Sequence, residues 1–385
     1  MKKRRFIAFF AALLFLLPTC LGAKVSALGV SASSAALMVL ETGELIYEKN
    51  AYTQRSMAST TKIMTSLIAL ETCTPQREII VTEDMVQVEG TSMGLLPGDS
   101  VTLKTLVYGM LLQSGNDAAN VTAIAVGGSV EDFVVMMNER AKEIGMKNTC
   151  FVTPSGLDDE NHYSTAYDMA LLGCEALKNP EFAAICSQKS AALYYGNPPY
   201  RRTLTNHNKL LWNYKDTIGI KTGFTKKSGR CLVSAAERDG VTLVAVTLNA
   251  PSDWSDHKAM FEYGFSVVEN RMIDCDISSL SLKVTGAESE RIGVELAYEP
   301  SVVVHSGSDA DIRQELFIKR FEYAPVEKGQ VVGEARYFIG EKMVCSVPIV
   351  TAESTARKKV IEEPKQEVAQ KGFFKRILEK IQSWF

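Results

Sequence analysis

Hydrophobic residues recur every three or four positions along several segments of the first 270 residues, and this spacing predicts amphipathic helices. In the first of these segments, Ile63, Met64, Leu67 and Ile68 follow a polar start at helical spacing. The predicted helices cover residues 59–72, 102–112, 116–126, 130–144, 165–177 and about 254–270.

Apolar and polar residues alternate at both ends of the same region, which predicts strands. Residues 35–51 are expected to form two strands around a turn at Gly43, and residues 229–250 two more that are joined at Asp239-Gly240. Because strands lie at both ends and helices lie between them, residues 28–272 are predicted to form an α/β domain whose sheet contains both ends of the segment.

The pattern changes after about residue 276, where short alternating runs are separated by Gly, Pro, Asp and Asn. Residues 273–351 are therefore predicted to form a small all-β domain. Residues 352–370 are charged and carry few large apolar side chains, so they are interpreted as a linker.

The terminal segment, residues 371–385, has its apolar and charged side chains on opposite faces of a helix. It is too short and too charged to span a bilayer, so a helix lying in a membrane surface is expected. A helix docked on its own protein would show the same stripe. The apolar face consists of Phe373, Phe374, Ile377, Leu378, Ile381, Trp384 and Phe385.

The N-terminus has the pattern of a secretory signal. A basic start, "MKKRR", precedes an apolar run from Phe6 to Leu17, and small residues end the segment at Ala27. This predicts a signal peptide over residues 1–27, with a short anchoring helix as the alternative. The mature protein is therefore expected at the outer face of the cytoplasmic membrane.

Composition narrows the function classes further. The chain has 385 residues, 46% apolar and 23% charged, with a formal charge of −3, and removal of the basic signal makes the exported part more acidic. This charge argues against nucleic acid as a partner. Seven scattered cysteines remain without a CxxC pair, so neither a disulfide framework nor a structural metal site is expected.

Three short motifs carry the candidate chemistry. Ser59 and Lys62 lie three residues apart at the start of the first predicted helix, but Ser255 and Lys258 form a second such pair, so the spacing alone is weak. The other two motifs are "SGN" at Ser114–Asn116, between two predicted helices, and "KTG" at Lys221–Gly223, at the start of a predicted strand.

In this order, the three motifs resemble the signature of penicillin-interacting serine enzymes. The segments "SMASTTKIMT", "LLQSGNDAAN", "HYSTAYDMALL", "GIKTGFT" and "APVEKGQVVGE" resemble the low-molecular-mass penicillin-binding proteins, which are serine-type D-alanyl-D-alanine carboxypeptidases. The overall form resembles their Gram-positive, sporulation-type branch. The resemblance implies a penicillin-binding protein/β-lactamase-like catalytic domain, no metal or organic cofactor, and covalent inhibition by β-lactam antibiotics.

The catalytic roles combine this resemblance with the chemistry of amide cleavage. Ser59 is the expected nucleophile and Lys62 its base, which requires a lysine with a lowered pKa. The apolar run after Lys62 predicts burial, and the charge of Lys221 adds to the effect. The resemblance implies that Ser114 relays a proton and that the backbone N–H groups of Ser59 and Phe224 form the oxyanion hole.

The resemblance also assigns the substrate contacts. Asn116 is expected to hold a backbone amide of the substrate, and Lys221 to support its terminal carboxylate with Thr222 and Thr225. Gly223 would let the substrate add to the strand edge. Some relatives use an Arg shortly before the KTG strand for the carboxylate, whereas this chain has "TNHNKLLW", so that contact stays open.

The expected reaction is removal of the terminal D-Ala from peptidoglycan stem pentapeptides. A β-lactamase is disfavoured, because the middle motif is Ser-Gly-Asn instead of Ser-Asp-Asn and no Glu-x-x-Leu-Asn string lies between Asn116 and Lys221. A D,D-endopeptidase and a catalytically silent wall-binding or penicillin-binding paralogue remain as alternatives.

Overall fold

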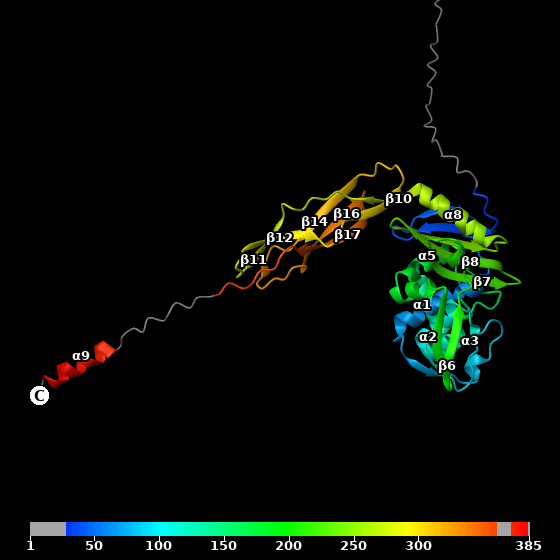
Figure 1. Ribbon diagram of the computed structural model, residues 1–385, viewed down its shortest axis with the longest axis horizontal. Coiled ribbons are helices and arrows are strands. Elements are labelled where there is room, and N and C mark those ends of the chain that lie inside the picture. The colour runs from blue at the N-terminus through cyan, green and yellow to red at the C-terminus, as the bar shows by residue number, and fades with distance from the viewer. Residues whose placement is uncertain (1–27, 360–370, 384–385) are drawn as a thin grey trace, which may run out of the picture. The chain divides into compact units, whose positions relative to one another are not determined.

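The computed structural model describes residues 28–359 and 371–383, and of residues 371–374 it describes the backbone alone. The expected signal peptide, most of the expected linker, Trp384 and Phe385 lie outside the described residues. The chain divides into two compact units, here called unit 1 and unit 2 (Figure 1). Unit 1 consists of Met1–Glu237 and Thr242–Gly264, and unit 2 of Arg238–Val241 and Phe265–Phe385.

Unit 1 contains a five-stranded sheet in the order β2-β1-β9-β8-β7, so that β7 forms an edge. Strands from both ends of the unit are paired, because β1 runs antiparallel to both β2 and β9. This confirms the predicted α/β arrangement. The strands are β1 (Ser34–Val39), β2 (Leu45–Lys49), β7 (Thr217–Thr225), β8 (Gly229–Arg238) and β9 (Val241–Leu248).

Helices cover both faces of this sheet. A side chain at Gly173 of α5 (Ala166–Leu177) would meet Val244, whereas one at Gly264 of α8 (Asp253–Val267) would meet Leu243. Consecutive residues of a strand point to opposite faces. Helices α5 and α8 therefore pack on opposite sides of β9.

The remaining helices of unit 1 follow the predicted order closely. The segment expected as one helix over 59–72 begins with a single 3₁₀ turn, η1 (Ala58–Thr61), before α1 (Lys62–Thr72). The short helices η2, α6 and α7 were not predicted. The others are η2 (Asp84–Val86), α2 (Leu103–Leu111), α3 (Asn116–Gly127), α4 (Val130–Ile144), α6 (Pro180–Cys186) and α7 (Leu210–Asn213).

A second, four-stranded sheet in unit 1 was also not predicted. Its order is β3-β4-β5-β6, and its longest pairing is the hairpin of β5 and β6. Two of its strands are only three residues long, which leaves little alternation to detect. The strands are β3 (Glu78–Ile80), β4 (Ser100–Thr102), β5 (Ser190–Gly196) and β6 (Pro199–Thr205).

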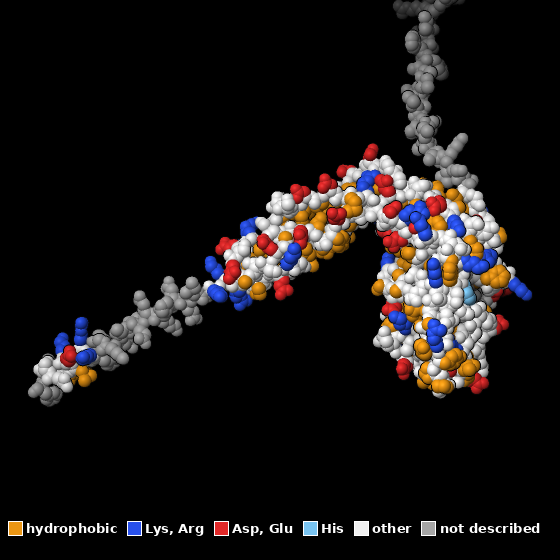
Figure 2. Space-filling view, in the orientation of Figure 1, with side chains coloured by type: hydrophobic (Ala, Val, Ile, Leu, Met, Phe, Trp, Pro, Cys, Tyr) orange, Lys and Arg blue, Asp and Glu red, His pale blue; other side chains and the backbone are white. Residues whose placement is uncertain are grey.

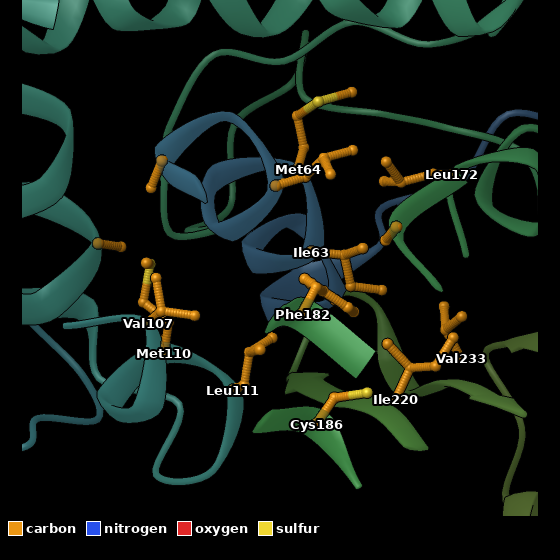
Figure 3. Close-up of a cluster of buried hydrophobic side chains, with 14 of the residues drawn as sticks. Ile63, Met64, Val107, Met110, Leu111, Leu172, Phe182, Cys186, Ile220 and Val233 are labelled. Carbon is orange, nitrogen blue, oxygen red and sulfur yellow. The ribbon is translucent and has the colours of Figure 1, made fainter. Parts of the chain in front are cut away.

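The main core of unit 1 surrounds α1. Ile63 and Met64 of this helix lie among Val107 of α2, Phe182 of α6 and Ile220 of β7 (Figure 3). All five side chains are buried. The apolar run that follows the Ser59 and Lys62 motif thus anchors the motif in the middle of the unit.

Unit 2 is built of strands, as predicted for residues 273–351. A six-stranded sheet has the order β14-β16-β17-β12-β11-β15, and β10 pairs with β13. The strands are β10 (Val268–Met272), β11 (Ser281–Thr285), β12 (Arg291–Leu296), β13 (Ser301–His305), β14 (Ile312–Ile318), β15 (Glu322–Tyr323), β16 (Val331–Ile339) and β17 (Lys342–Thr351).

The boundary between the units differs from the expected one at 272/273. Helix α8 ends at Val267, and the next strand, β10, pairs with β13 over its whole length. Residues 268–272 therefore belong to unit 2. A single apolar pattern over 254–270 hid the change from helix to strand, because short apolar runs fit both periods.

The terminal segment forms helix α9 (Lys371–Gln382), and its apolar residues Ile377, Leu378 and Ile381 are exposed. Figure 2 shows basic and apolar side chains on different sides of it. Across residues 28–359 and 371–383 no single helix is long and apolar enough to cross a bilayer, although α3 and α4 would pass by length and composition if taken together across their 86° bend.

Candidate active site

Ser59 and Lys62 lie in direct contact at the junction of η1 and α1. The Nζ atom of Lys62 is 3.0 Å from the Oγ atom of Ser59. Ser59 belongs to the 3₁₀ turn and Lys62 is the first residue of α1. Residues three apart are aligned in a 3₁₀ turn, so the tighter geometry keeps the two side chains on one side.

Lys62 is fully buried, and its Nζ has three hydrogen-bonding neighbours. Besides Ser59 Oγ, it contacts Asn116 Oδ1 and the carbonyl oxygen of Ser155, each at 2.7 Å. Burial, followed by the charge of Lys221, holds the pKa of Lys62 well below its ordinary value, and only the charge of Asp117 opposes this shift. A neutral amine donates two hydrogen bonds and keeps one lone pair. In the neutral form the two carbonyl-type oxygens would use the donors, and the lone pair would be left for the Ser59 hydroxyl.

The backbone on either side of this contact is strained. Ala58 has φ of +49° and Ser114 has φ of +62°, a region that residues other than glycine rarely adopt. Such conformations persist where the surroundings hold them. Here the Thr61 hydroxyl donates to the Ala58 carbonyl at 2.8 Å, and a side chain at Gly156 would collide with that same oxygen.

His162 forms a hydrogen bond to the strained turn that carries Ser59. Its Nδ1 accepts from the backbone N–H of Val152 at 2.9 Å, so the proton of the neutral ring is on Nε2, which lies 2.8 Å from Thr61 Oγ1. Burial lowers the pKa of His162 to about 4. The contact of His162 with the turn that carries Ser59 is visible only in the fold.

The Ser114–Asn116 motif lies between α2 and α3, as predicted. Both ends of the Asn116 amide are engaged by the protein, because Oδ1 accepts from Lys62 and Nδ2 donates to the Glu89 carbonyl at 2.6 Å. A substrate amide would therefore reach Asn116 Nδ2 only by replacing Glu89. Ser114 is buried but lines the groove described below.

Asp117 also has a role that the sequence did not reveal. Its buried carboxylate accepts from the Ser92 hydroxyl and from three consecutive backbone N–H groups, so it fixes a loop whose neighbouring residue Thr91 lines the groove. Asn116 holds the same loop through the Thr91 and Glu89 carbonyls. The three N–H groups belong to Met93, Gly94 and Leu95, at 2.9 to 3.0 Å.

The KTG motif lies near the end of β7, not at the start of a strand as predicted. Lys221 is almost fully buried, its Nζ donates to the Thr222 carbonyl at 2.8 Å, and burial lowers its pKa to about 7. Thr225 contacts Ser228 Oγ and Asp158 Oδ1. Thr222 is partly exposed and faces the groove.

Gly223 brings β7 against the Ser59 turn. A Cβ atom at this position would lie 3.0 Å from the Met57 carbonyl oxygen and 3.1 Å from the backbone nitrogens of Ser59 and Thr60. These are backbone atoms, which cannot move aside as a flexible side chain can. Glycine is therefore required for this close approach of strand and turn.

These elements enclose a groove of about 310 Å³, here called the Ser59 groove. It brings together Ser59, Ser114, Thr222, Gly223 and Phe224 of the predicted site residues. The other four do not line it: Lys62, Asn116 and Lys221 are buried, and Thr225 is partly exposed. The Ser59 groove is lined by Ser59, Thr91, Ser114, His207, Lys209, Thr222, Gly223, Phe224, Arg230, Asp253 and Trp254.

Arg230 was missed by the sequence analysis. It lies on β8 opposite Phe224, donates to Asp253 Oδ1 at 2.8 Å, and stacks 5.3 Å from the ring centre of Trp254. Among the described residues, no cluster of three or more His, Cys, Asp or Glu could hold a metal ion. The sequence feature that could have located Arg230 is the turn "TKKSG". This turn joins the two strands and so places Arg230 opposite Phe224, the residue after KTG.

Comparisons with known proteins identify the family of the chain. Residues 22–252 match the family model of D-alanyl-D-alanine carboxypeptidases, and residues 276–357 match the model of the C-terminal domain of penicillin-binding protein 5. D-alanyl-D-alanine carboxypeptidase DacF of Bacillus subtilis is 32% identical over 322 residues, which are 81% of this chain and 82% of that protein. DacC of Escherichia coli is 31% identical over 402 residues, covering 97% of this chain and 95% of its own.

Solved structures show the same likeness. Penicillin-binding protein 5 of Haemophilus influenzae has a TM-score of 0.60 at 25% identity, covering 85% of this chain and 98% of its own. The Streptomyces K15 DD-transpeptidase has a TM-score of 0.59 at 31% identity and covers 62% of this chain and 98% of its own, so that structure corresponds to the catalytic part alone. As the three motifs predicted, this chain belongs to the D-alanyl-D-alanine carboxypeptidase family.

Proposed function

We propose that this protein removes the terminal D-alanine of peptidoglycan stem peptides ending in D-Ala-D-Ala, through an acyl-enzyme on Ser59. The observation that carries the proposal is the 3.0 Å contact between Ser59 Oγ and the Nζ atom of a buried lysine, at the floor of an open groove. A nucleophile in contact with a base of lowered pKa is the requirement for covalent amide cleavage.

In the acylation step, neutral Lys62 accepts the hydroxyl proton while Ser59 Oγ attacks the carbonyl carbon between the two D-alanines. The negative charge that develops on the carbonyl oxygen needs donors in place beforehand. Ser59 lies in the first turn of η1, where backbone N–H groups have no acceptor within the helix. The Ser59 and Phe224 N–H groups serve as these donors.

The leaving D-alanine takes its proton from Lys62 through Ser114, whose side chain lines the groove beside Ser59. Lys62, neutral again, then activates a water molecule that hydrolyses the ester and regenerates the serine. The loop beside Lys62 presents the Ser155 carbonyl and no carboxylate at this contact. A slow hydrolysis of penicillin adducts fits this arrangement better than β-lactamase activity does.

The terminal carboxylate of the substrate is held by Arg230 together with Thr222 and Lys221. Arg230 is half-exposed in the Ser59 groove and uses one nitrogen for Asp253, so further guanidinium N–H groups remain for a second carboxylate. Lys221 supports the same site from below as a buried charge. Lys209 at the rim adds attraction for an anionic substrate.

The protein is exported and held at the outer face of the cytoplasmic membrane by α9. Support comes from the basic and apolar pattern of residues 1–27 and from the exposed apolar residues of α9. Basic residues of the same helix, Lys375 and Lys380 among them, would favour anionic lipid.

The test of the reaction is mass spectrometry of a synthetic stem pentapeptide ending in D-Ala-D-Ala after incubation with the protein. Loss of one alanine is expected, and Ser59→Ala is the control that should leave the peptide intact. An unchanged peptide with a penicillin adduct on Ser59 would indicate a silent binder. Cleavage of cross-linked dimers alone would indicate an endopeptidase, and rapid turnover of penicillin a β-lactamase.

A further inference from the structure

One end of unit 2 carries three consecutive basic residues. Arg357, Lys358 and Lys359 follow β17 and are exposed. They are pinned to the sheet, because Lys358 N donates to the Gly286 carbonyl at 2.8 Å and Arg357 forms a bridge with Ala287. Their charge is therefore held at a defined place, and Figure 2 shows basic side chains at this end of the unit, with acidic side chains among them.

The same residues border a hollow without acidic side chains. Arg357, Lys358 and Lys359 line it together with Tyr323, Thr285, Gly286 and Ala324. Glu322 precedes Tyr323 in the chain, but its carboxylate is paired with Lys319 at 2.7 Å. The hollow thus presents positive charge and backbone groups to an incoming anion.

Two exposed aromatic side chains lie at the same end. Tyr323 is 65% exposed and Phe321 45%, and their rings contact each other edge to face at 5.3 Å. Aromatic rings beside basic residues are typical of protein surfaces that meet the headgroup region of a bilayer. Here Arg357, Lys358, Lys359, Phe321 and Tyr323 are together called the basic end.

We infer that the basic end binds the anionic phospholipid headgroups of the membrane surface. The inference rests on the proposed anchoring by α9. Only 11 residues separate Lys359 from the start of α9 at Lys371, a span of at most about 40 Å. A tether this short keeps the basic end near the surface that α9 occupies, so that weak headgroup contacts become effective. The membrane contact then has two parts, and the basic end orients unit 2 on the lipid.

The experiment measures binding of the full chain to vesicles of phosphatidylcholine with and without phosphatidylglycerol. In one variant Arg357, Lys358 and Lys359 are changed to Gln. The matched control changes three exposed lysines of unit 1, Lys142, Lys147 and Lys215, to Gln, and so removes the same charge. The basic-end variant is expected to bind vesicles containing phosphatidylglycerol at least about tenfold more weakly than the control. Equal binding of the two variants would overturn the inference.

A third variant separates this result from the anchor itself. Ile377→Gln, Leu378→Gln and Ile381→Gln together remove the exposed apolar face of α9. Unchanged vesicle binding of this variant would refute the proposed anchor. The comparison between the basic-end variant and the control variant could still be interpreted in that case. Thermal unfolding of all the variants checks that unit 2 is folded. Tyr323→Ser is a second, milder change of the basic end, and it is expected to weaken vesicle binding in the same direction.

Discussion

Lys62 is chemically useful because of where it lies. A lysine in water is protonated at neutral pH and cannot accept the proton of a serine. Burial in the core of unit 1 lowers its pKa, and Asn116 and Ser155 occupy the two N–H donors of the neutral amine. The apolar helix that follows the motif therefore has two functions. It forms the core, and by burying Lys62 it lowers the pKa of the expected base.

The first prediction concerns the assignment of this pair. A penicillin should acylate Ser59, and Lys62→Ala should lower the acylation rate by about a hundredfold to ten-thousandfold, the usual contribution of a general base. Peptide mapping of the labelled protein and the time course of labelling measure both effects. Ser255, exposed on α8, is the internal control. An adduct at Ser255, or Lys62→Ala labelled at the parent rate, would contradict the assignment.

The second prediction is the pH dependence of acylation. The rate should rise with pH as Lys62 loses its proton. It should fall again above about pH 7 as Lys221, whose pKa burial lowers to about 7, loses the charge that supports the substrate carboxylate. A β-lactam whose carboxylate is esterified should show the rising limb alone. A falling limb of equal size for both compounds would show that Lys221 does not act through the carboxylate.

The third prediction concerns acid stability. Buried His257 lies between Ser234 Oγ and Thr247 Oγ1, and burial lowers its pKa to about 3. Below its ordinary pKa of about 6.5, the unfolded chain binds a proton at this residue that the folded protein does not. The free energy of unfolding should thus decrease as pH falls from 6.5 towards 3, by about 1.4 kcal/mol per pH unit from this residue.

The measurement for this third prediction is thermal or urea unfolding at several pH values. His257→Gln should show a shallower decrease between pH 6.5 and pH 4, whatever its stability at neutral pH. The same slope in the parent protein and in His257→Gln would mean that other groups dominate the acid response.

At the scale of elements, the site depends on the packing of β7 against η1. The two elements are more than 150 residues apart in the chain, and Gly223 is the point where their backbones meet. This contact brings β7 against the turn that carries Ser59, and both Ser59 and Phe224 line the Ser59 groove. The helices that supply the other groups were predictable from periodicity, but their approach to β7 was not.

The fourth prediction tests this contact. Gly223→Ala would place a Cβ atom at 3.0 to 3.1 Å from three backbone atoms of the turn, which should destabilise unit 1 by about 1–3 kcal/mol. Acylation should slow by tenfold or more, since small displacements of reacting groups are costly. Gly293→Ala on β12 is the control, because its Cβ would meet only Ala352 at 3.6 Å. Similar behaviour of the two variants would contradict the role of Gly223.

At the scale of the whole molecule, the two units have separate cores and separate chemistry. All residues that line the Ser59 groove belong to unit 1, and the core of unit 2 consists of side chains from its own strands and loops. The match to the Streptomyces K15 structure covers 98% of that chain but only 62% of this one. The K15 structure therefore corresponds to the catalytic part of this chain. Unit 1 is therefore expected to fold and react by itself.

The fifth prediction follows from this division. A truncated chain of residues 28–267, ending with α8 and before the strand β10, should unfold cooperatively and keep most of its reactivity with penicillin. Rates of labelling before and after truncation measure this, with Ser59→Ala in the truncated chain as the control. A folded but unreactive fragment would show that unit 2 shapes the groove.

Local pattern determined much of this protein. The helical periods located α1 to α5 and α8 within a few residues, and the order of three motifs favoured Ser59 over Ser255 as the predicted nucleophile. These features depend on neighbours in the chain, because helix periodicity and turn chemistry act over a few residues. The small sheet of β3 to β6 was not predicted, and two of its strands, β3 and β4, are only three residues long.

The tertiary structure alone decided the chemistry of the site. Lys62 acquires its lowered pKa from burial and from the charge of Lys221. Its hydrogen-bond partners lie 54 and 93 positions away, and His162 reaches Thr61 across 101 positions. Arg230 enters the groove because β8 is paired with β7. Burial, charge and hydrogen bonding depend on distance in space, which a linear pattern does not contain. For that reason the motifs predicted which residues would act as nucleophile and base, and the fold supplied the groups that contact them.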